Sequence, residues 1–249
     1  MRGQKQIEVK RIIVIPTYNE TGSLESFLSA LVPKCSSHTA IVICDDSGPH
    51  LNHFYISLAS KLRTKDGPEI LVDFSNTKNG RGNAVLRGFK ISLINYPNSE
   101  LFLECDADES HRVKDILMIL DYNPNSEFVI GSRYLPQSEI VGWPTSRRVF
   151  SRMLNSLIPM SLRIKTSDAT NGLRRYSRRA VEALLRSHLR TSGFIVLSEF
   201  ALILKYNNIH PEDVPTTFIN RHIGSSTVTY RELLNSAKGL IKLIVRKNA

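Results

Sequence analysis

The chain has 249 residues, of which 41% are hydrophobic and 22% charged, a balance typical of a globular protein with one large domain or two modest ones. Its net charge of +10 favours anionic partners such as nucleotides, phospholipid surfaces or nucleic acid. No stretch approaches the roughly 18 apolar residues of a membrane span, and the N-terminal residues lack the apolar core of a signal peptide. The three cysteines show no metal-ligand spacing, which indicates a reducing compartment.

The first half of the chain alternates short apolar runs with amphipathic segments. Buried strands are predicted over residues 11–16, 40–44, 69–74, 101–105 and 128–130. Helices are predicted over residues 21–33, 51–62, 79–94 and 113–120. Strands that alternate with helices form right-handed crossover units, so the sequence predicts an α/β fold with a mainly parallel sheet.

Polar residues follow four of these strands directly. They are Tyr18, Asn19 and Glu20, then Asp45 and Asp46, then Asp106 and Asp108, and finally Arg133. Open α/β sheets bind ligands beyond the carboxyl ends of their strands. Solvated loops would not need such regularity, so we expect a ligand site at this edge of the sheet.

Asp106 and Asp108 are separated by one residue at the end of an apolar run. If the strand continues past Cys105, both carboxylates point to the same side, because side chains alternate along a strand. Two neighbouring carboxylates suit Mg²⁺ or Mn²⁺, which bind oxygen ligands and often share them with substrate phosphates. The simpler interpretation of this pair is an ordinary polar turn after a strand.

The second half of the chain differs in character, although no linker marks a separate domain. Gly142-Trp143-Pro144 predicts a turn that carries the only tryptophan. A basic helix follows it, and in that helix Arg147, Arg148 and Arg152 lie among Val149, Phe150, Met153 and Leu154. A helix over residues 194–206 and a strand over 209–214 are also predicted. Four further arginines are expected to be solvated surface charges: Arg174, Arg175, Arg178 and Arg179.

The segment from Tyr230 onward has the pattern of an amphipathic helix. Its expected apolar face consists of Leu233, Leu234, Ala237, Leu240, Ile241 and Ile244, with lysines and arginines beside it. Such a helix either lies at an anionic membrane surface or packs on the sheet as core, and periodicity does not distinguish the two. We therefore expect a main domain over residues 1–229 and this helix over residues 230–249.

In the order of its motifs, the chain resembles the family-2 glycosyltransferases of the GT-A fold. Within that family it is most similar to the polyprenol-phosphate mannosyltransferases, the dolichyl-phosphate mannose synthase group. The resemblance covers roughly residues 10–228 and depends on the joint order of short motifs. They are Ile15 to Glu20, Asp45-Asp46-Ser47, Asn79 to Ala84, Asp106-Ala107-Asp108, Gly131 to Tyr134, Gly142-Trp143-Pro144 with Arg147 and Asn155, Ser167 to Thr170, and Phe218 to Arg221 with Gly224 and Ser226.

The resemblance implies a role for each matching residue. The nucleoside would be held by Pro16, Tyr18, Glu20, Ile43 and Asp45. Asp106, the Ala107 backbone and Asp108 would hold the Mg²⁺ or Mn²⁺ ion and the diphosphate. Arg133 and Arg221 would reach phosphates, and Arg147 the acceptor phosphate. The catalytic residues would be Asp108, Arg133 and Arg147.

Two positions depart from the family pattern. Ser110 stands where the family often has glutamine, and Thr227 where it usually has lysine. A shorter polar group then lies near the metal, and one positive charge near the leaving diphosphate is missing. Both departures leave open a paralogue with another sugar, another acceptor or weak activity.

The implied function is inverting, metal-dependent transfer of a hexose to a polyprenyl (dolichyl) phosphate, with mannose from GDP-mannose as the favoured donor. The alternatives are a UDP-glucose or UDP-N-acetylhexosamine donor and a glycan acceptor. The expected location is peripheral, on the cytoplasmic face of a membrane, with the terminal helix or a membrane-anchoring partner as the attachment. Nucleic acid is not an expected partner, because aspartates at the strand ends would repel its backbone. A dehydrogenase is also disfavoured, because Pro16 to Glu20 follow the first strand where a Gly-x-Gly-x-x-Gly turn belongs.

Overall fold

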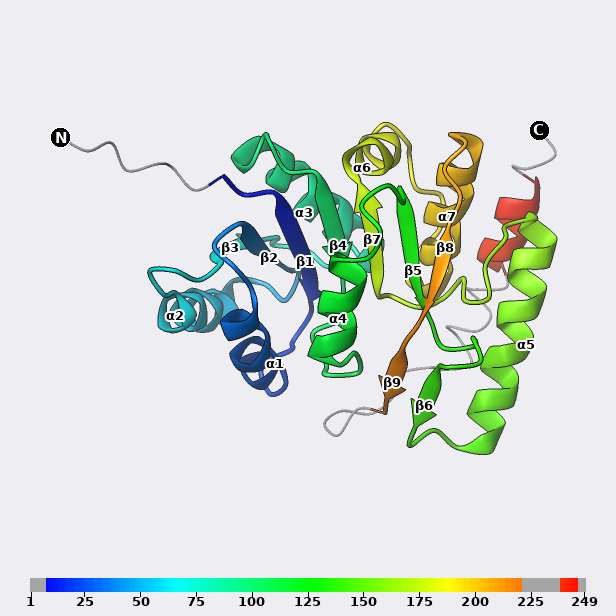
Figure 1. Ribbon diagram of the computed structural model, residues 1–249, viewed down its shortest axis with the longest axis horizontal. Coiled ribbons are helices and arrows are strands. Elements are labelled where there is room, and N and C mark those ends of the chain that lie inside the picture. Colours follow the sequence, from blue (N-terminus) through cyan, green and yellow to red (C-terminus); the bar gives the residue numbers. More distant parts are fainter. Residues whose placement is uncertain (1–7, 221–237, 246–249) are drawn as a thin grey trace.

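The structure, a computed structural model, describes residues 8–220 and 238–245 (Figure 1). Its strands are β1 (Arg11–Thr17), β2 (Thr39–Asp45), β3 (Glu69–Phe74), β4 (Leu101–Glu104), β5 (Phe128–Ser132), β6 (Glu139–Val141), β7 (Arg174–Ser177), β8 (Glu212–Pro215) and β9 (Thr217–Ile219). Its α-helices are α1 (Leu24–Leu31), α2 (Asn52–Leu62), α3 (Arg81–Asn95), α4 (Val113–Leu120), α5 (Thr145–Leu162), α6 (Arg178–Leu185) and α7 (Val196–Tyr206). Short 3₁₀ turns are η1 (Val32–Lys34), η2 (Pro49–Leu51) and η3 (Gly193–Ile195).

Seven strands form the central sheet, in the order β3-β2-β1-β4-β7-β5-β8. β1 pairs in parallel with β2 and β4, β2 with β3, and β5 with β8. β7 is antiparallel to both of its neighbours, β4 and β5. The prediction of a mainly parallel sheet is therefore confirmed. β6 and β9 form a small separate ribbon beside the carboxyl ends of the main strands.

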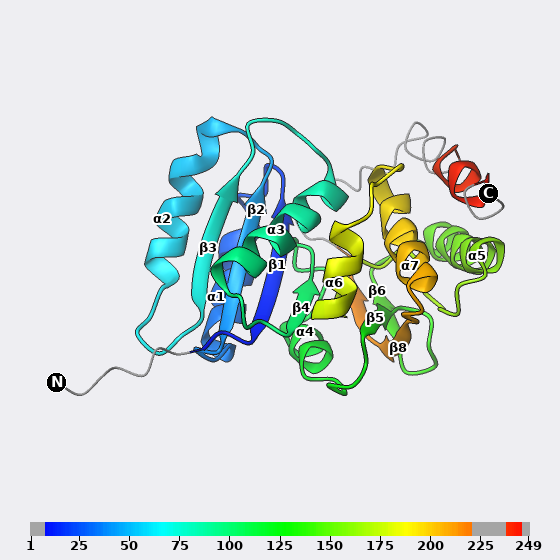
Figure 2. The ribbon, with the colours of Figure 1, turned by 90° about the horizontal axis from the view of Figure 1, so that it is seen from above.

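Helices cover both faces of the sheet, which makes three layers (Figure 2). Alternate residues of β1 supply the two cores, because successive side chains of a strand point to opposite faces. Ile12 and Val14 pack under α3, α6 and α7. Ile13 and Ile15 pack under α1, α2 and α4. Burial on both faces explains why the sequences of β1 and β2 are continuously apolar.

Two of the four arginines that were expected at the surface lie in the interior, and that expectation was wrong for them. Arg174 and Arg175 are fully buried in β7. Arg174 donates hydrogen bonds to the carbonyl oxygens of Ala169, Asn171 and Leu197. Arg175 donates to those of Tyr122, Asn123 and Ser126. Buried cations are tolerated here because backbone carbonyls replace their water.

The C-terminal segment is described only over residues 238–245, which are helical and lie beside α5 in both views (Figures 1 and 2). Leu243 is fully buried, and Leu240 and Ile244 pack against the same core as α7. Ile241 is exposed, although the sequence pattern placed it on the apolar face. This stretch therefore uses its apolar side as core. Leu233, Leu234 and Ala237 lie outside the described residues. No helix in the part of the chain that is described is long and apolar enough to cross a membrane.

Candidate active site

The end of β2 carries a carboxylate that organises two loops. Asp45 is fully buried, and its Oδ1 accepts hydrogen bonds from the hydroxyls of Thr17, at 3.0 Å, and Ser47, at 2.5 Å. Its Oδ2 accepts from the Ser47 backbone N–H at 3.1 Å. Asp45 thereby ties the end of β1 to the loop after β2.

The neighbouring Asp46 anchors the loop before α3. Its Oδ2 accepts from the Asn79 backbone N–H at 2.9 Å, and its Oδ1 accepts from Arg87 Nη1 at 2.9 Å. Arg87 also forms an ion pair with Asp73 at the end of β3. The first three strands of the sheet edge are therefore joined by charged hydrogen bonds.

The residues that were predicted to hold a nucleoside differ in accessibility. Tyr18 is exposed, with the ammonium of Lys78 3.8 Å from the centre of its ring. Glu20 accepts a hydrogen bond from the Ser23 hydroxyl at 3.1 Å. Pro16 is half-buried at the end of β1. Ile43 is fully buried in β2, in the core under α1 and α2. Their contacts with a nucleoside stay a prediction.

Asp106 and Asp108 lie in the loop after β4 and not in the strand, which ends at Glu104. Their positions are therefore set by the loop and not by strand alternation. The side chain of Asp106 is 28% exposed, whereas Asp108 is buried and accepts from the Ser110 backbone N–H at 3.1 Å. Both offer the hard oxygen ligands that Mg²⁺ and Mn²⁺ prefer. Within the described ranges, no cluster of three or more acidic, histidine or cysteine side chains is arranged to hold a metal ion.

A guanidinium group lies directly against Asp106, the first aspartate of this pair. Arg81 Nε donates to Asp106 Oδ1 at 3.0 Å, and its Nη1 forms an ion pair with Glu104, which is fully buried. The Tyr176 hydroxyl donates to the other oxygen of Glu104. Nε2 of His111 lies 3.6 Å from Asp106 Oδ2. Burial alone would raise the pKa of Asp106, but the charge of Arg81 and the nearby His111 hold it well below its usual range.

Arg133 follows β5, and the loop before β7 holds its side chain through hydrogen bonds. Asp168 receives its Nε and Nη2 hydrogen bonds, and the Thr170 hydroxyl accepts a further one from Nη2 at 2.8 Å. The amide of Asn155 on α5 holds the same loop, since its oxygen accepts from the Ala169 backbone N–H at 2.9 Å. The motif residues around 132, 155 and 168 thus form one hydrogen-bonded unit.

Trp143 lies beside both arginines that were predicted to be catalytic. The guanidinium carbon of Arg147 lies 4.0 Å from the centre of its ring, and that of Arg133 lies 5.5 Å away. The ring meets Phe218 edge to face at 5.2 Å, and Phe218 meets His111 at 5.4 Å. These contacts connect both arginines to Asp106. Arg221 and Thr227 lie outside the described residues.

The sequence analysis missed Arg81, Glu104 and His111 as parts of the site. Arg81 stands between two glycines of a recognised motif, and His111 follows the metal motif by three residues, so position alone was the available signal. The side chain of Ser110, which was expected to be a polar group near the metal, is fully buried beside Asp108, and its contact with a metal stays a prediction.

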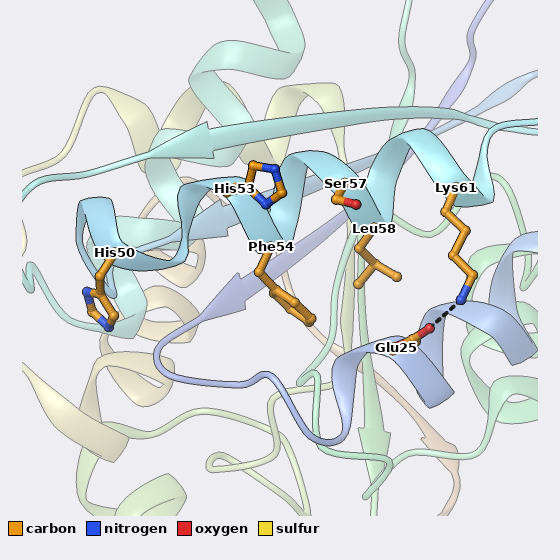
Figure 3. Close-up of a pocket in the computed structure, with 7 residues that line it drawn as sticks. All are labelled: Glu25, His50, His53, Phe54, Ser57, Leu58 and Lys61. Atoms are coloured by element: carbon orange, nitrogen blue, oxygen red, sulfur yellow. Dashed lines mark hydrogen bonds and ion pairs between the residues drawn. The ribbon is translucent and has the colours of Figure 1, made fainter.

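A separate groove of about 450 Å³ lies between α1 and α2 (Figure 3). Its lining consists of Glu25, His50, His53, Phe54, Ser57, Leu58 and Lys61. A salt bridge of 2.7 Å joins Glu25 to Lys61 across it. None of the predicted site residues lines this groove, so it is distinct from the edge site.

Residues 12–185, more than half of the chain, match the family model described as glycosyl transferase family 2. The chain belongs to glycosyl transferase family 2. This family-2 enzyme is 28% identical over 221 residues to a polyprenol monophosphomannose synthase of Mycolicibacterium smegmatis. The aligned region covers 88% of this chain and 81% of that protein. It is 29% identical over 219 residues to an undecaprenyl-phosphate mannosyltransferase of Micrococcus luteus, with 88% and 87% covered.

Solved structures confirm the GT-A fold of this glycosyltransferase. Glucosyl-3-phosphoglycerate synthase from Mycobacterium tuberculosis, crystallised with Mg²⁺ and UDP, has a TM-score of 0.64 at 14% identity, over 96% of this chain and 79% of that one. Mannosyl-3-phosphoglycerate synthase from Rubrobacter xylanophilus has a TM-score of 0.57 at 16% identity, over 96% and 74%. At these identities the likeness concerns the fold alone.

Proposed function

We propose that this glycosyltransferase transfers mannose from GDP-mannose to a polyprenyl phosphate, with inversion at the anomeric carbon. The observation that carries the proposal is the gathering of Arg133 and Arg147 around Trp143, connected to Asp106 through Phe218 and His111. Two arginines beside a carboxylate pair suit a reaction in which both substrates carry phosphate. The names of the two relatives, a polyprenol monophosphomannose synthase and an undecaprenyl-phosphate mannosyltransferase, support the same assignment.

The acceptor phosphate explains why arginines and not a general base are needed. Its second pKa is about 6, so it is largely ionised at neutral pH and is already a nucleophile. Asp168 and Thr170 engage Nε and Nη2 of Arg133, so the phosphate would be bound at Nη1. Arg147, stacked on Trp143, would bind a second phosphate oxygen. Guanidinium groups bind phosphate oxygens through charge-assisted hydrogen bonds of defined geometry.

Asp106 and Asp108 would hold a divalent cation together with the donor diphosphate. When bound, Mg²⁺ or Mn²⁺ supplies Lewis-acid stabilisation of the departing diphosphate. Proteins of the same fold have been crystallised with Mn²⁺ or Mg²⁺ and UDP, which supports divalent metal use. Tyr18, Glu20 and Asp45 lie at the same edge and would hold the nucleoside, with Pro16, Ile43 and Ala107 as the remaining residues of the motifs.

The enzyme would work at a membrane surface, because a polyprenyl acceptor stays in its bilayer. One face of α5 carries Val149, Phe150, Met153, Leu157 and Met160, each between 37% and 68% exposed. Arg148, Arg152 and Arg163 flank this face and are exposed, and α5 contains no acidic residue. Exposed apolar side chains bordered by cations are typical of surfaces that bind anionic lipid. We therefore propose peripheral attachment on the cytoplasmic face, with a membrane-anchoring partner as the alternative.

A donor screen tests the proposal most directly. Purified enzyme, Mg²⁺ and a short-chain polyprenyl phosphate are incubated in turn with GDP-mannose, UDP-glucose and UDP-N-acetylhexosamines, and lipid-linked sugar is measured. Product from GDP-mannose alone is the expected result. Product from a UDP-sugar alone would refute the donor. Transfer only to a glycan acceptor, supplied in a parallel incubation in place of polyprenyl phosphate, would refute the role of the two arginines.

A further inference from the structure

We infer that Arg81 is a positioning residue for the metal site. Its charge holds Asp106 in place and makes tight binding of a divalent cation depend on a bound nucleoside diphosphate. The inference rests on the proposed function insofar as Asp106 is taken as a metal ligand. It concerns binding and not transfer, so its test requires neither acceptor nor sugar.

All three nitrogen positions of the Arg81 guanidinium are engaged. Nε donates to Asp106 Oδ1 at 3.0 Å, Nη1 to Glu104, and Nη2 to the carbonyl oxygen of Gly172 at 3.1 Å. The side chain is only 20% exposed. A planar fork held at three points has a single orientation, so the position of Asp106 is fixed by a side chain from the first turn of α3.

The backbone at Gly172 lies very close to both Arg81 and Asp106. A Cβ atom at this position would lie 2.5 Å from Arg81 Nη2 and 2.9 Å from Asp106 Oδ2, closer than real Cβ contacts allow. Gly172, near the end of the loop that binds Arg133, thus leaves room for the Arg81–Asp106 pair. Any side chain here would displace one of the two groups.

Arg81 cannot readily leave when a metal arrives, because Glu104 is fully buried and needs a countercharge. A cation that binds Asp106 alone is therefore repelled by a guanidinium in contact with the same carboxylate, in a site where solvent screens charges weakly. Free GDP, which is the probe and the diphosphate that leaves, carries about three negative charges at neutral pH, more than one divalent cation neutralises. Its phosphate oxygens cancel the repulsion, so that metal and diphosphate each tighten the binding of the other.

The experiment measures Mn²⁺ binding by the loss of the free-ion electron paramagnetic resonance signal, with and without saturating GDP. For the wild type we expect GDP to lower the Kd for Mn²⁺ by about tenfold or more, within the usual range of such coupling. In Arg81→Gln, Mn²⁺ alone should bind more tightly and the effect of GDP should shrink to about twofold. Arg81→Lys, which keeps the charge, should retain most of the coupling, and Gly172→Ala should weaken it.

The matched control is Lys90→Gln, which removes one exposed charge from the same helix and should leave the coupling unchanged. A wild type that binds Mn²⁺ equally well with and without a nucleoside diphosphate, whether GDP or UDP, would overturn the inference without any variant. Equal coupling in the wild type and Arg81→Gln would overturn it as well. If Arg81→Gln does not fold, Gly172→Ala provides the test. Unchanged coupling between Mn²⁺ and the diphosphate in that variant contradicts the inference. Repeating the titration with UDP separates it from the donor assignment, because coupling to UDP alone supports the role of Arg81 while refuting GDP-mannose.

Discussion

Asp168 fixes Arg133 through three hydrogen bonds, from Nε at 2.7 Å, from Nη2 at 2.8 Å and from the backbone N–H at 3.1 Å. The arginine side chain is 7% exposed and the aspartate side chain is fully buried. Asp168 also accepts from the backbone N–H groups of Thr170 and Asn171. The same carboxylate therefore shapes its own loop and sets the direction in which Arg133 presents its remaining donors.

Replacement of Asp168 by Asn should destabilise the fold. The change leaves a buried guanidinium without its countercharge, and breaking such a pair typically costs about 3–5 kcal/mol. Urea unfolding followed by circular dichroism measures the loss. Asp121→Asn is the matched control, because its ion pair with Arg11 is exposed and should contribute less than about 1 kcal/mol. Equal losses in the two variants would show that burial of the Asp168–Arg133 pair is unimportant.

Asp106→Asn and Asp108→Asn should each abolish turnover with Mg²⁺ or Mn²⁺ while the near-ultraviolet circular dichroism spectrum is preserved. Loss of a metal ligand removes charge stabilisation of the leaving diphosphate. Initial rates of lipid-linked sugar formation measure the effect, and chelation of the metal from the wild type should reproduce it. The metal role is wrong if both variants keep more than about a tenth of the wild-type kcat, equivalent to roughly 1.4 kcal/mol in the barrier.

Arg147→Ala should raise the KM for polyprenyl phosphate about tenfold or more and change the KM for the nucleotide sugar little. A hydrogen bond to a charged group contributes roughly 1.5–3 kcal/mol, which corresponds to that factor. Steady-state kinetics with each substrate varied in turn provides the measurement. Arg63→Ala is the control, because Arg63 is exposed directly after α2, at the other end of the molecule from α5, and donates to a backbone carbonyl oxygen, that of Ile70 (Figure 1). Equal effects on both KM values would indicate that Arg147 only supports the structure.

Met153→Glu combined with Met160→Glu should reduce co-sedimentation with anionic liposomes at low salt. The two substitutions place negative charge in the middle of the exposed apolar face of α5, where it opposes both burial and attraction to anionic lipid. Ile56→Glu is the control, because Ile56 is 56% exposed on α2, at the other end of the molecule (Figure 1). If the control and the double variant pellet equally, α5 does not contact the membrane.

The alternative attachment through residues 230–249 is tested in the same assay. A chain that ends at Thr229 lacks the terminal segment but retains α5. Loss of pelleting only in this truncated chain would assign the attachment to the terminal segment and would contradict the role of α5. Because Leu243 is fully buried in the core, thermal unfolding of the truncated chain must be compared with that of the full chain.

The sequence by itself determined the layered α/β fold and the edge at which the site lies. Residues 12–15 and 40–44 are continuously apolar because β1 and β2 are buried on both faces, and this pattern is local. Once the strands are parallel, their carboxyl ends meet at one edge, so Asp45, Asp106 and Arg133 had to lie there. The motif order was sufficient for the family, since each motif is a short contiguous stretch.

Only the tertiary structure decided which charges of the site hold one another. Arg81 and Glu104 are 23 residues apart, and Arg133 and Asp168 are 35 apart. Arg174 and Arg175 look like surface residues in the sequence, because the carbonyl oxygens that neutralise their burial come from backbone that no side-chain pattern reveals. The position of β7 between β4 and β5 also depends on long-range packing and not on the composition of the strand itself. Local periodicity fixes the elements of this protein, whereas the pairing of buried charges depends on how its loops close in space.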